Sequence, residues 1–427
     1  MAGTGPYTRR GGVVRTVSAG ALAVLLSAGA LPTAVATPAG APAPAPRGPA
    51  GVTRLLSVAA DGGQADGPSG RPVVSADGRV VAFTSQATNL VAGDTNGQSD
   101  LFVEDLRGGG LRRVADPHGE ISSPTLSANG RYVAYTTRDA EGSAVIVRDL
   151  WKGGTERADV DLPMQHIDAH APTVSADGRT VAFAVLGTDP SRPGAQAVYL
   201  RDLRAQRTEL VSFPAEPDET FLGFRAPTLS ADGRRVAYQY VHGSPPRGDW
   251  SDIYVHDRDT GGETQIDTPH DGSPADGAAT NPLFSADGDT LAFDSSASNL
   301  VPGRDPNGSH NPFVCDLRTG TLQRIDAVRP GPEGVLSVDG VAADGSKLLL
   351  DTWAVLTAED AEYVRDLRTG SDVLVSPDKD GGPGNAIDAR TDAAARTVVF
   401  SGFDGENFVP GDTNGVADVF VFVAKKR

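Results

Sequence analysis

Two loops of the chain carry side-chain oxygens at alternate positions around a glycine, an arrangement that suits a hard cation. Their oxygen-bearing residues are Asp94, Asn96, Asp100, Asp412, Asn414 and Asp418. A looser third copy begins at Asp305. Alternating oxygen ligands form the first half of a calcium loop, although no bidentate acid completes an EF-hand here. The loops therefore predict either Ca²⁺ binding or Asx-type turns that lead Asp100 and Asp418 into the next strand.

A second group of candidate ligands is the segment His166-Ile167-Asp168-Ala169-His170. Alternate residues of an extended chain share one side, so the two imidazoles and the carboxylate could bind a transition metal together. Solvated loop histidines are the alternative, because the segment occurs once and has no fixed fourth ligand. His118 and His270 belong to the same set of ligand-binding candidates.

Residues for covalent catalysis are not evident in the chain. No G-x-S-x-G pentapeptide marks the nucleophile elbow of a serine hydrolase. Cys315 is the single cysteine, so no intramolecular disulfide can form. It stands at a strand position that other repeats fill with charged residues, and we expect a half-exposed, incidental thiol. The sequence therefore assigns no catalytic residue.

The candidate residues must be positioned by a repeat whose first copy is Ser75-Ala76-Asp77-Gly78-Arg79-Val80-Val81-Ala82-Phe83. Further copies begin at residues 127, 175, 230, 285, 342 and 392. A period near fifty residues in an all-β pattern predicts a propeller. Asp-Gly suits a tight hairpin turn, and large, small and large side chains alternate along the second strand. Sheets of this kind can stack on one another.

Seven copies predict seven four-stranded antiparallel blades. A third strand follows each hairpin, and most of these strands end in Asp-Leu-Arg, whose aspartate can accept backbone N–H groups in the next turn. Only six fourth strands come after them, whereas residues 53–58 precede the first hairpin and match the fourth-strand pattern. We therefore expect the N-terminal strand to close the seventh blade and remove the open edges of the ring.

The repeat Pro-x-x-Ser-Ala-Asp-Gly-Arg-x-Val-Ala-Phe, followed by Asp-x-Phe-Val-x-Asp-Leu, resembles the WD-like propeller repeat of the TolB-type family over residues 52–427. The periplasmic TolB protein has an α/β domain before its propeller, whereas this chain has a linker, so the envelope role of TolB is not carried over. Secreted bacterial proteins built of these repeats alone are the closer resemblance. Some seven-bladed polysaccharide lyases have related repeats and a histidine-bound metal, which the resemblance extends to His166 and His170.

The connections from strand two to three, and from strand four to the next strand one, are long and irregular. We name the side of the ring that carries them the long-loop face, and six of the seven histidines fall on it, with only His256 expected in a strand. Binding sites concentrate on loops that a rigid scaffold carries. We therefore place a ligand on this face, over the central channel.

Residues 1–36 have the layout of a secretory signal, with Arg9 and Arg10 before an apolar run that ends at Ala34-Val35-Ala36. Cleavage after Ala36 predicts a secreted protein, and an uncleaved membrane anchor is the alternative. The arginine pair leaves both Sec and twin-arginine export open. Residues 37–51 predict a Pro/Ala-rich linker before the propeller at 52–427.

The formal net charge of −17 disfavours nucleic acid and anionic membranes as partners. We predict a secreted, monomeric, non-enzymatic propeller that binds an extracellular protein or glycan through its acidic long-loop face. Two alternatives stay open at this point. One is a metal-dependent enzyme similar to polysaccharide lyases, and the other is a structural protein that Ca²⁺ stabilises.

Overall fold

The fold comes from a computed structural model of the whole chain. It describes residues 51–114, 116, 119–162, 168–189, 192–212, 221–243, 249–305, 310–326, 335–354, 359–402 and 408–425. These residues belong to one compact unit, Arg47–Arg427, and they form strands without a helix. Within this described part, no helix could cross a membrane.

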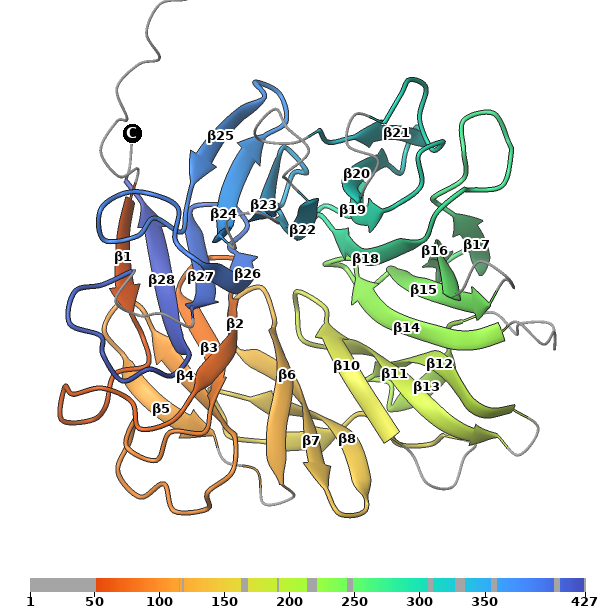
Figure 1. The fold of residues 1–427 in the computed structure, drawn as a ribbon. Coiled ribbons are helices and arrows are strands. Elements are labelled where there is room, and N and C mark those ends of the chain that lie inside the picture. The colour runs from red at the N-terminus through yellow and green to blue at the C-terminus, as the bar shows by residue number, and fades with distance from the viewer. Residues whose placement is uncertain are drawn as a thin grey trace, which may run out of the picture. The chain divides into compact units, whose positions relative to one another are not determined.

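The strands form seven four-stranded antiparallel sheets, which are the blades of a propeller (Figure 1). Blades one to three are β2 (Ser69–Val74), β3 (Val80–Ser85), β4 (Asp100–Asp105) and β5 (Gly110–Val114); β6 (Glu120–Leu126), β7 (Tyr132–Asp139), β8 (Gly142–Asp149) and β9 (Thr155–Arg157); β10 (Asp168–Val174), β11 (Thr180–Asp189), β12 (Arg192–Asp202) and β13 (Arg207–Leu210). Blades four to six are β14 (Phe221–Leu229), β15 (Arg235–Gly243), β16 (Asp249–Asp257) and β17 (Gly262–Gln265); β18 (Ala279–Phe284), β19 (Thr290–Ser295), β20 (Asn311–Asp316) and β21 (Thr321–Arg324); β22 (Val335–Val341), β23 (Lys347–Ala354), β24 (Glu359–Asp366) and β25 (Ser371–Leu374). Blade seven is β26 (Ala386–Thr391), β27 (Thr397–Gly402), β28 (Asp418–Ala424) and β1 (Gly51–Leu55). The all-β, seven-bladed architecture agrees with the sequence prediction.

The N-terminal strand lies in the last blade, as expected. β1 pairs antiparallel with β28 from Gly51 opposite Ala424 to Leu55 opposite Phe420, so this strand begins two residues before the predicted Thr53. Blades seven and one also touch through their inner strands, and the Ala393 N–H donates to the Ala76 carbonyl at 3.0 Å. The N-terminal strand is thus the fourth strand of blade seven, and blades seven and one also contact each other directly.

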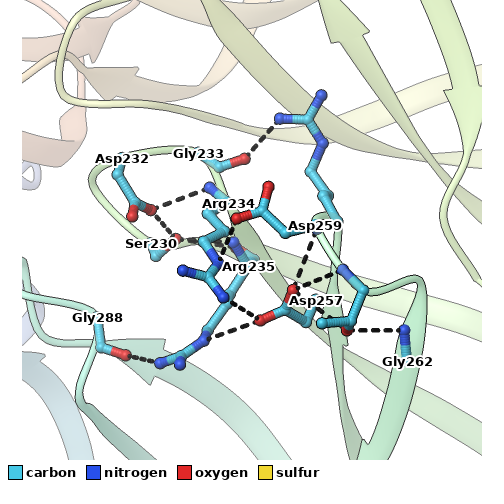
Figure 2. A network of polar contacts seen from close by, with 11 residues as sticks. Ser230, Asp232, Gly233, Arg234, Arg235, Asp257, Asp259, Gly262 and Gly288 are labelled. Carbon is cyan, nitrogen blue, oxygen red and sulfur yellow. Dashed lines mark hydrogen bonds and ion pairs between the residues drawn. The ribbon is translucent and has the colours of Figure 1, made fainter.

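The repeated Ser-x-Asp-Gly turn stabilises each hairpin by side-chain hydrogen bonds. In blade four, the Ser230 hydroxyl donates to Asp232 at 2.6 Å, and the backbone N–H of Arg235 donates to Ser230 at 2.9 Å (Figure 2). Arg234 reaches Asp257 at the end of β16, at 3.1 Å. The Arg235 guanidinium donates to the Gly288 carbonyl in the turn of blade five at 2.6 Å. One turn thus connects three strands and the neighbouring blade.

The aspartate at the end of the third strand has the structural role that the sequence predicts. Asp149 accepts the backbone N–H groups of Trp151 and Lys152 at 3.0 and 3.1 Å. The Arg131 guanidinium also binds it, and that bond is the main reason why the pKa of Asp149 falls to about 2. Equivalent N–H bonds are made by Asp105, Asp202, Asp257, Asp316 and Asp366.

The core lies between the blades, where large side chains of one sheet face small ones of the next. Val81 and Phe83 of β3 pack toward blade seven, and Ala82 packs toward blade two. Leu349 takes the place of that alanine in blade six and packs against blade seven. Alternation along the strands therefore produces one apolar layer at every junction between blades.

Two expectations about exposure and strand length are wrong. Cys315 in β20 is buried rather than half-exposed, and burial raises the pKa of its thiol to about 11. The segment from Val241 to Ser251, expected as a loop, contains the ends of β15 and β16, which pair His242 with Trp250. Pairing between β15 and β16 places the residues up to Gly243 and from Asp249 onward in strands, and residues 244–248 lie outside the described part of the chain.

Candidate functional site

The inner strands of the blades line a channel of about 510 Å³. Its lining residues come from the first strands of blades one to five and blade seven. Each of these strands has a bulge near its middle, where the pairing register shifts. In the first five blades the bulge lies at the repeat proline, and in blade seven it lies at Ala389, which replaces that proline.

The residue before the repeat proline, or before Ala389, has a positive φ in all six strands. These residues are Arg71, Ser123, Ala171, Ala226, Asn281 and Asp388, with φ from 50° to 54°. Such a conformation is uncommon outside glycine and costs about 1–3 kcal/mol, so strain of this kind is frequent at functional sites. The backbone geometry repeats while five different residue types occupy the six positions, with alanine in both blade three and blade four. A constant frame with varied side chains is the arrangement expected of a binding site.

The charges in the channel wall are clustered on blades one and seven. Arg71, Asp388 and Arg390 are exposed there, and Arg390 keeps 46% of its side chain accessible. The two guanidinium groups suit carboxylate or phosphate groups because each can donate two parallel hydrogen bonds.

Behind Arg390, blade six buries a pair of acidic residues. Glu362 in β24 is fully buried, and its carboxyl group lies within hydrogen-bonding reach of Asp339 in β22. Among the described residues, neither oxygen of Glu362 receives a hydrogen bond from a donor. Burial, followed by the charges of Asp339 and Asp351, raises the pKa of Glu362 well above its usual range. The two carboxyl groups can hydrogen-bond to each other only through a proton, since a carboxylate has no donor of its own.

The acid pair is connected to the channel and to blade five. Arg390 lies 3.9 Å from Asp339, whose side chain is 18% exposed. Asp294 at the end of β19 accepts the Val338 N–H at 2.9 Å, and burial raises the pKa of Asp294 to about 8. Clusters of buried acids with raised pKa values are frequent at functional sites, so this region is a second candidate site beside the channel.

Sequence reasoning missed the acid pair, although the repeat itself contains a signal for it. Glu362 occupies the strand position that Leu101 has in blade one. Glu362 pairs with Asp351 and Leu101 pairs with Thr84, and these two partners are equivalent residues of the second strand. Asp339 stands where five other blades have proline. Both substitutions put a charge at a position that the repeat keeps apolar. Aligning the copies strand by strand would have revealed them.

The predicted calcium loops lie at the start of the third strands in blades one and seven. In blade one, Asp94 and Asp100 are both bound by the Arg113 guanidinium, at 3.1 and 2.6 Å. Asn96 donates to Asp100 at 3.3 Å and accepts the Gln98 N–H at 3.1 Å, which is the Asx-type turn of the alternative interpretation. In blade seven, Asn414 makes the same contacts to Asp418 and Val416.

The predicted histidine group is placed only in part. His118 and His166 lie outside the described residues. Asp168 and His170 occupy β10 on either side of the buried Ala169, and Asp168 accepts bonds from the backbone and hydroxyl of Ser143. No group of three or more His, Cys, Asp or Glu side chains in the described segments could hold a metal ion.

Two further described histidines contact different neighbours. His270 contacts the Asn299 carbonyl at 3.2 Å, and His242 contacts Asp252 at 3.0 Å. His170 and His242 lie in strands, so the expectation that only His256 does so is wrong. The structure therefore does not bring the described histidines to one centre.

No protein-family model and no curated protein matches the chain. Among solved structures, an oligogalacturonate lyase from Vibrio parahaemolyticus has a TM-score of 0.59 at 13% identity, and the match covers 88% of this chain and 97% of that one. An oligogalacturonate lyase in complex with manganese has a TM-score of 0.61 at 12% identity, covering 88% and 98%. The β-propeller domain of the Trilobed protease from Pyrococcus furiosus has a TM-score of 0.56 at 13% identity, covering 84% and 94%. These likenesses establish the propeller fold, the fold that the resemblance to TolB-type repeats implies.

Proposed function

We propose that the chain is a secreted, non-enzymatic propeller that binds an extracellular protein or glycan at its central channel. The observation that carries the proposal is the ring of strained residues before the repeat prolines. Six blades present one backbone geometry with different side chains to a cavity of about 510 Å³. Ligand pockets of about 300–1,000 Å³ with a few placed polar groups are typical of binding sites.

Within that range of partners, the channel favours a glycan that bears carboxylate groups. Arg71 and Arg390 line the same cavity from adjacent blades, and both are exposed. A rigid pair of guanidinium groups recognises carboxylates with little loss of side-chain entropy. A uronic-acid oligosaccharide would place its carboxylates on these groups while its ring faces contact the apolar lining from Val73 and Leu126.

The test is titration calorimetry of the purified chain with oligogalacturonate and with a neutral oligosaccharide of equal length. We expect binding of the acidic glycan only, weakened about tenfold or more in Arg71→Ala and in Arg390→Ala. Arg107→Ala is the matched control, because Arg107 is exposed in the turn after β4 and its side chain lies outside the channel lining. Equal binding of both sugars, or equal loss in the control, would overturn the glycan assignment.

The metal-dependent lyase is the competing function, and the fold likeness to two oligogalacturonate lyases is its support. Absorbance of unsaturated sugar products, followed in the same samples with Mn²⁺ added, separates the two proposals. Turnover that is lost in His170→Ala would establish the enzyme. Binding without turnover would support the scaffold.

A further inference from the structure

The carboxylates at the start of the third strand in blade one are neutralised by a cation from within the chain. Asp94 is 8% exposed and Asp100 is fully buried. The Arg113 guanidinium bridges them from the fourth strand, where Arg113 pairs with Phe102. Blade one therefore contains two acids and their counter-charge.

Blade five has the same arrangement with one acid fewer. Its third strand begins with Asn311, whose amide donates to Asp305 at 3.3 Å. Arg324 occupies the register of Arg113, since it pairs with Phe313, and it donates to the Arg304 carbonyl at 2.9 Å. A guanidinium thus stands beside this loop as well.

Blade seven has both acids and lacks the guanidinium. The register of β1 on β28 pairs Phe420 with Leu55, so a leucine stands where blades one and five have arginine. Asp418 is fully buried, and Asp412 is 4% exposed. Asp418 accepts hydrogen bonds from Ser57 and Asn414, whereas Oδ2 of Asp412 has no hydrogen-bond partner among the described residues.

Two buried carboxylates without a counter-charge are unstable as anions. Asp412 and Asp418 stand at the two ends of one loop that leads into β28, and both side chains are buried. In blade one the counter-charge comes from Arg113, so blade seven would need a cation from outside the chain.

We propose that Asp412 and Asp418 bind a hard divalent cation, Ca²⁺, at the position that Arg113 occupies in blade one. The Ser57 hydroxyl and the Asn414 amide nitrogen both donate to Asp418, while the Asn414 oxygen accepts the Val416 N–H. The ligand atoms for a cation are therefore the carboxylate oxygens of Asp412 and Asp418 and the hydroxyl oxygen of Ser57. Oxygen donors in an irregular loop suit Ca²⁺ better than Mg²⁺, which demands near-octahedral geometry, or Zn²⁺, which favours nitrogen and sulfur. The site lies between β1 and β28, so the bound ion would strengthen the joint between the two chain ends.

The experiment is thermal unfolding and titration calorimetry of the whole chain in EDTA, Ca²⁺ and Mg²⁺ at pH 7.5. We expect one Ca²⁺ per chain and a rise of about 2–4 °C in the melting temperature. Asp412→Asn should abolish both, and Leu55→Arg should abolish them while raising the melting temperature in EDTA. Asp94→Ala is the matched control, because Arg113 already neutralises that loop, and it should keep the full Ca²⁺ response.

Absence of a Ca²⁺ effect in the wild-type chain would overturn the proposal and assign a shared proton to the pair. A Ca²⁺ response that survives in Asp412→Asn, or that disappears in Asp94→Ala, would overturn it as well. If Leu55→Arg does not fold, Asp412→Asn alone decides the outcome. None of these readings depends on the channel ligand, so the glycan proposal can fail without affecting this one.

Discussion

Asp294 couples folding to pH through a single buried carboxyl group. Burial raises its pKa to about 8, and the charges of Asp339 and Asp351 add to the effect. The folded chain thus keeps a proton that the unfolded chain releases near pH 4. Its contribution to stability is fully present below that pH and disappears as the pH rises through about 8.

We expect the free energy of unfolding to fall between pH 5 and 8 by about 1.4 kcal/mol per pH unit for each such group. Asp294→Asn should remove the contribution of one group from this slope, as measured by urea unfolding between pH 5 and 8. Asp149→Asn is the control, because the pKa of Asp149 is lowered to about 2 and its titration lies outside the range. An unchanged slope in Asp294→Asn would contradict the assignment.

We expect Glu362 to lower the free energy of unfolding, whereas the apolar residues at this strand position in the other blades raise it. Replacing it with leucine, the residue that blade one has at this level, should raise stability by about 1–3 kcal/mol, since a buried acid is exchanged for an apolar side chain. The reverse change at the matched position, Leu101→Glu, should lower stability by about 3 kcal/mol or more. Chemical unfolding measures both variants.

The same Glu362→Leu protein reports whether the acid pair is functional. If stability rises while glycan affinity falls, the acid pair is retained for binding. A variant that is destabilised would instead show that the Asp339 carboxyl group depends on Glu362 for its proton and hydrogen bond.

The sequence predicted where the candidate site lies but not which residues form it. The long loops on one face pointed to the central channel, and five of the seven copies share the Pro-x-x-Ser frame whose strands line it. The sequence could not show that Arg113 binds the calcium loop of blade one, because Arg113 approaches Asp94 only through the pairing of β5 with β4. The acids of blade six stand in a divergent copy, and its sequence alone is equally compatible with drift and with a site. Contacts between strands that are distant in sequence decided both cases.

At the scale of elements, the turn between the first and second strands stabilises its own blade and also packs against the preceding blade. A Cβ on Gly178, at φ +74°, would lie 2.1 Å from the Tyr132 ring at the start of β7. The glycines of other turns approach the same strand position of their preceding blades, among them Gly130 against Val80 and Gly345 against Thr290. Blade seven has Ala395 at this point, with φ 51°.

These contacts predict opposite effects for two exchanges. Gly178→Ala should destabilise the propeller by more than about 1–2 kcal/mol, because the left-handed backbone and the Tyr132 ring both oppose a methyl group. Ala395→Gly should stabilise it by about 0.5–1 kcal/mol through relief of the same backbone strain. Differential scanning fluorimetry of the two variants beside the wild type checks the signs. Equal signs would show that the blade-seven turn has repacked around alanine.

Strand positions were more predictable than strand lengths. Asp-Gly turns and alternating side chains mark the hairpins directly, so β3 and β4 lie where the pattern places them. The sequence did not predict the long second and third strands of blade four, because their ends contain polar residues. Tyr240 and His242 stack on each other at 5.1 Å, and the strand pairing continues through them. Pairing across a hairpin, rather than local propensity, determines where such strands end.

At the scale of the whole molecule, β1 supplies the outer edge of blade seven. Deletion of residues 51–57 should expose β28 and remove the Ser57 bond to the Val419 N–H. We expect a lower melting temperature and association in size-exclusion chromatography with light scattering, because an unpaired edge recruits other strands. A peptide of residues 51–57 added in trans should reverse both effects. A monomer with unchanged stability would show that the inner contacts suffice to hold the ring.

The pairing of β1 with β28 also sets an order of events during biosynthesis. β1 is the first strand of the propeller to leave the ribosome, and its partner is the last. Blades one to six each use neighbouring segments and can form as the chain grows, whereas blade seven has to wait until β28 has been made. During that interval the growing protein carries β1 as an unpaired strand. A chaperone that recognises β1 would keep it available until the ring can close.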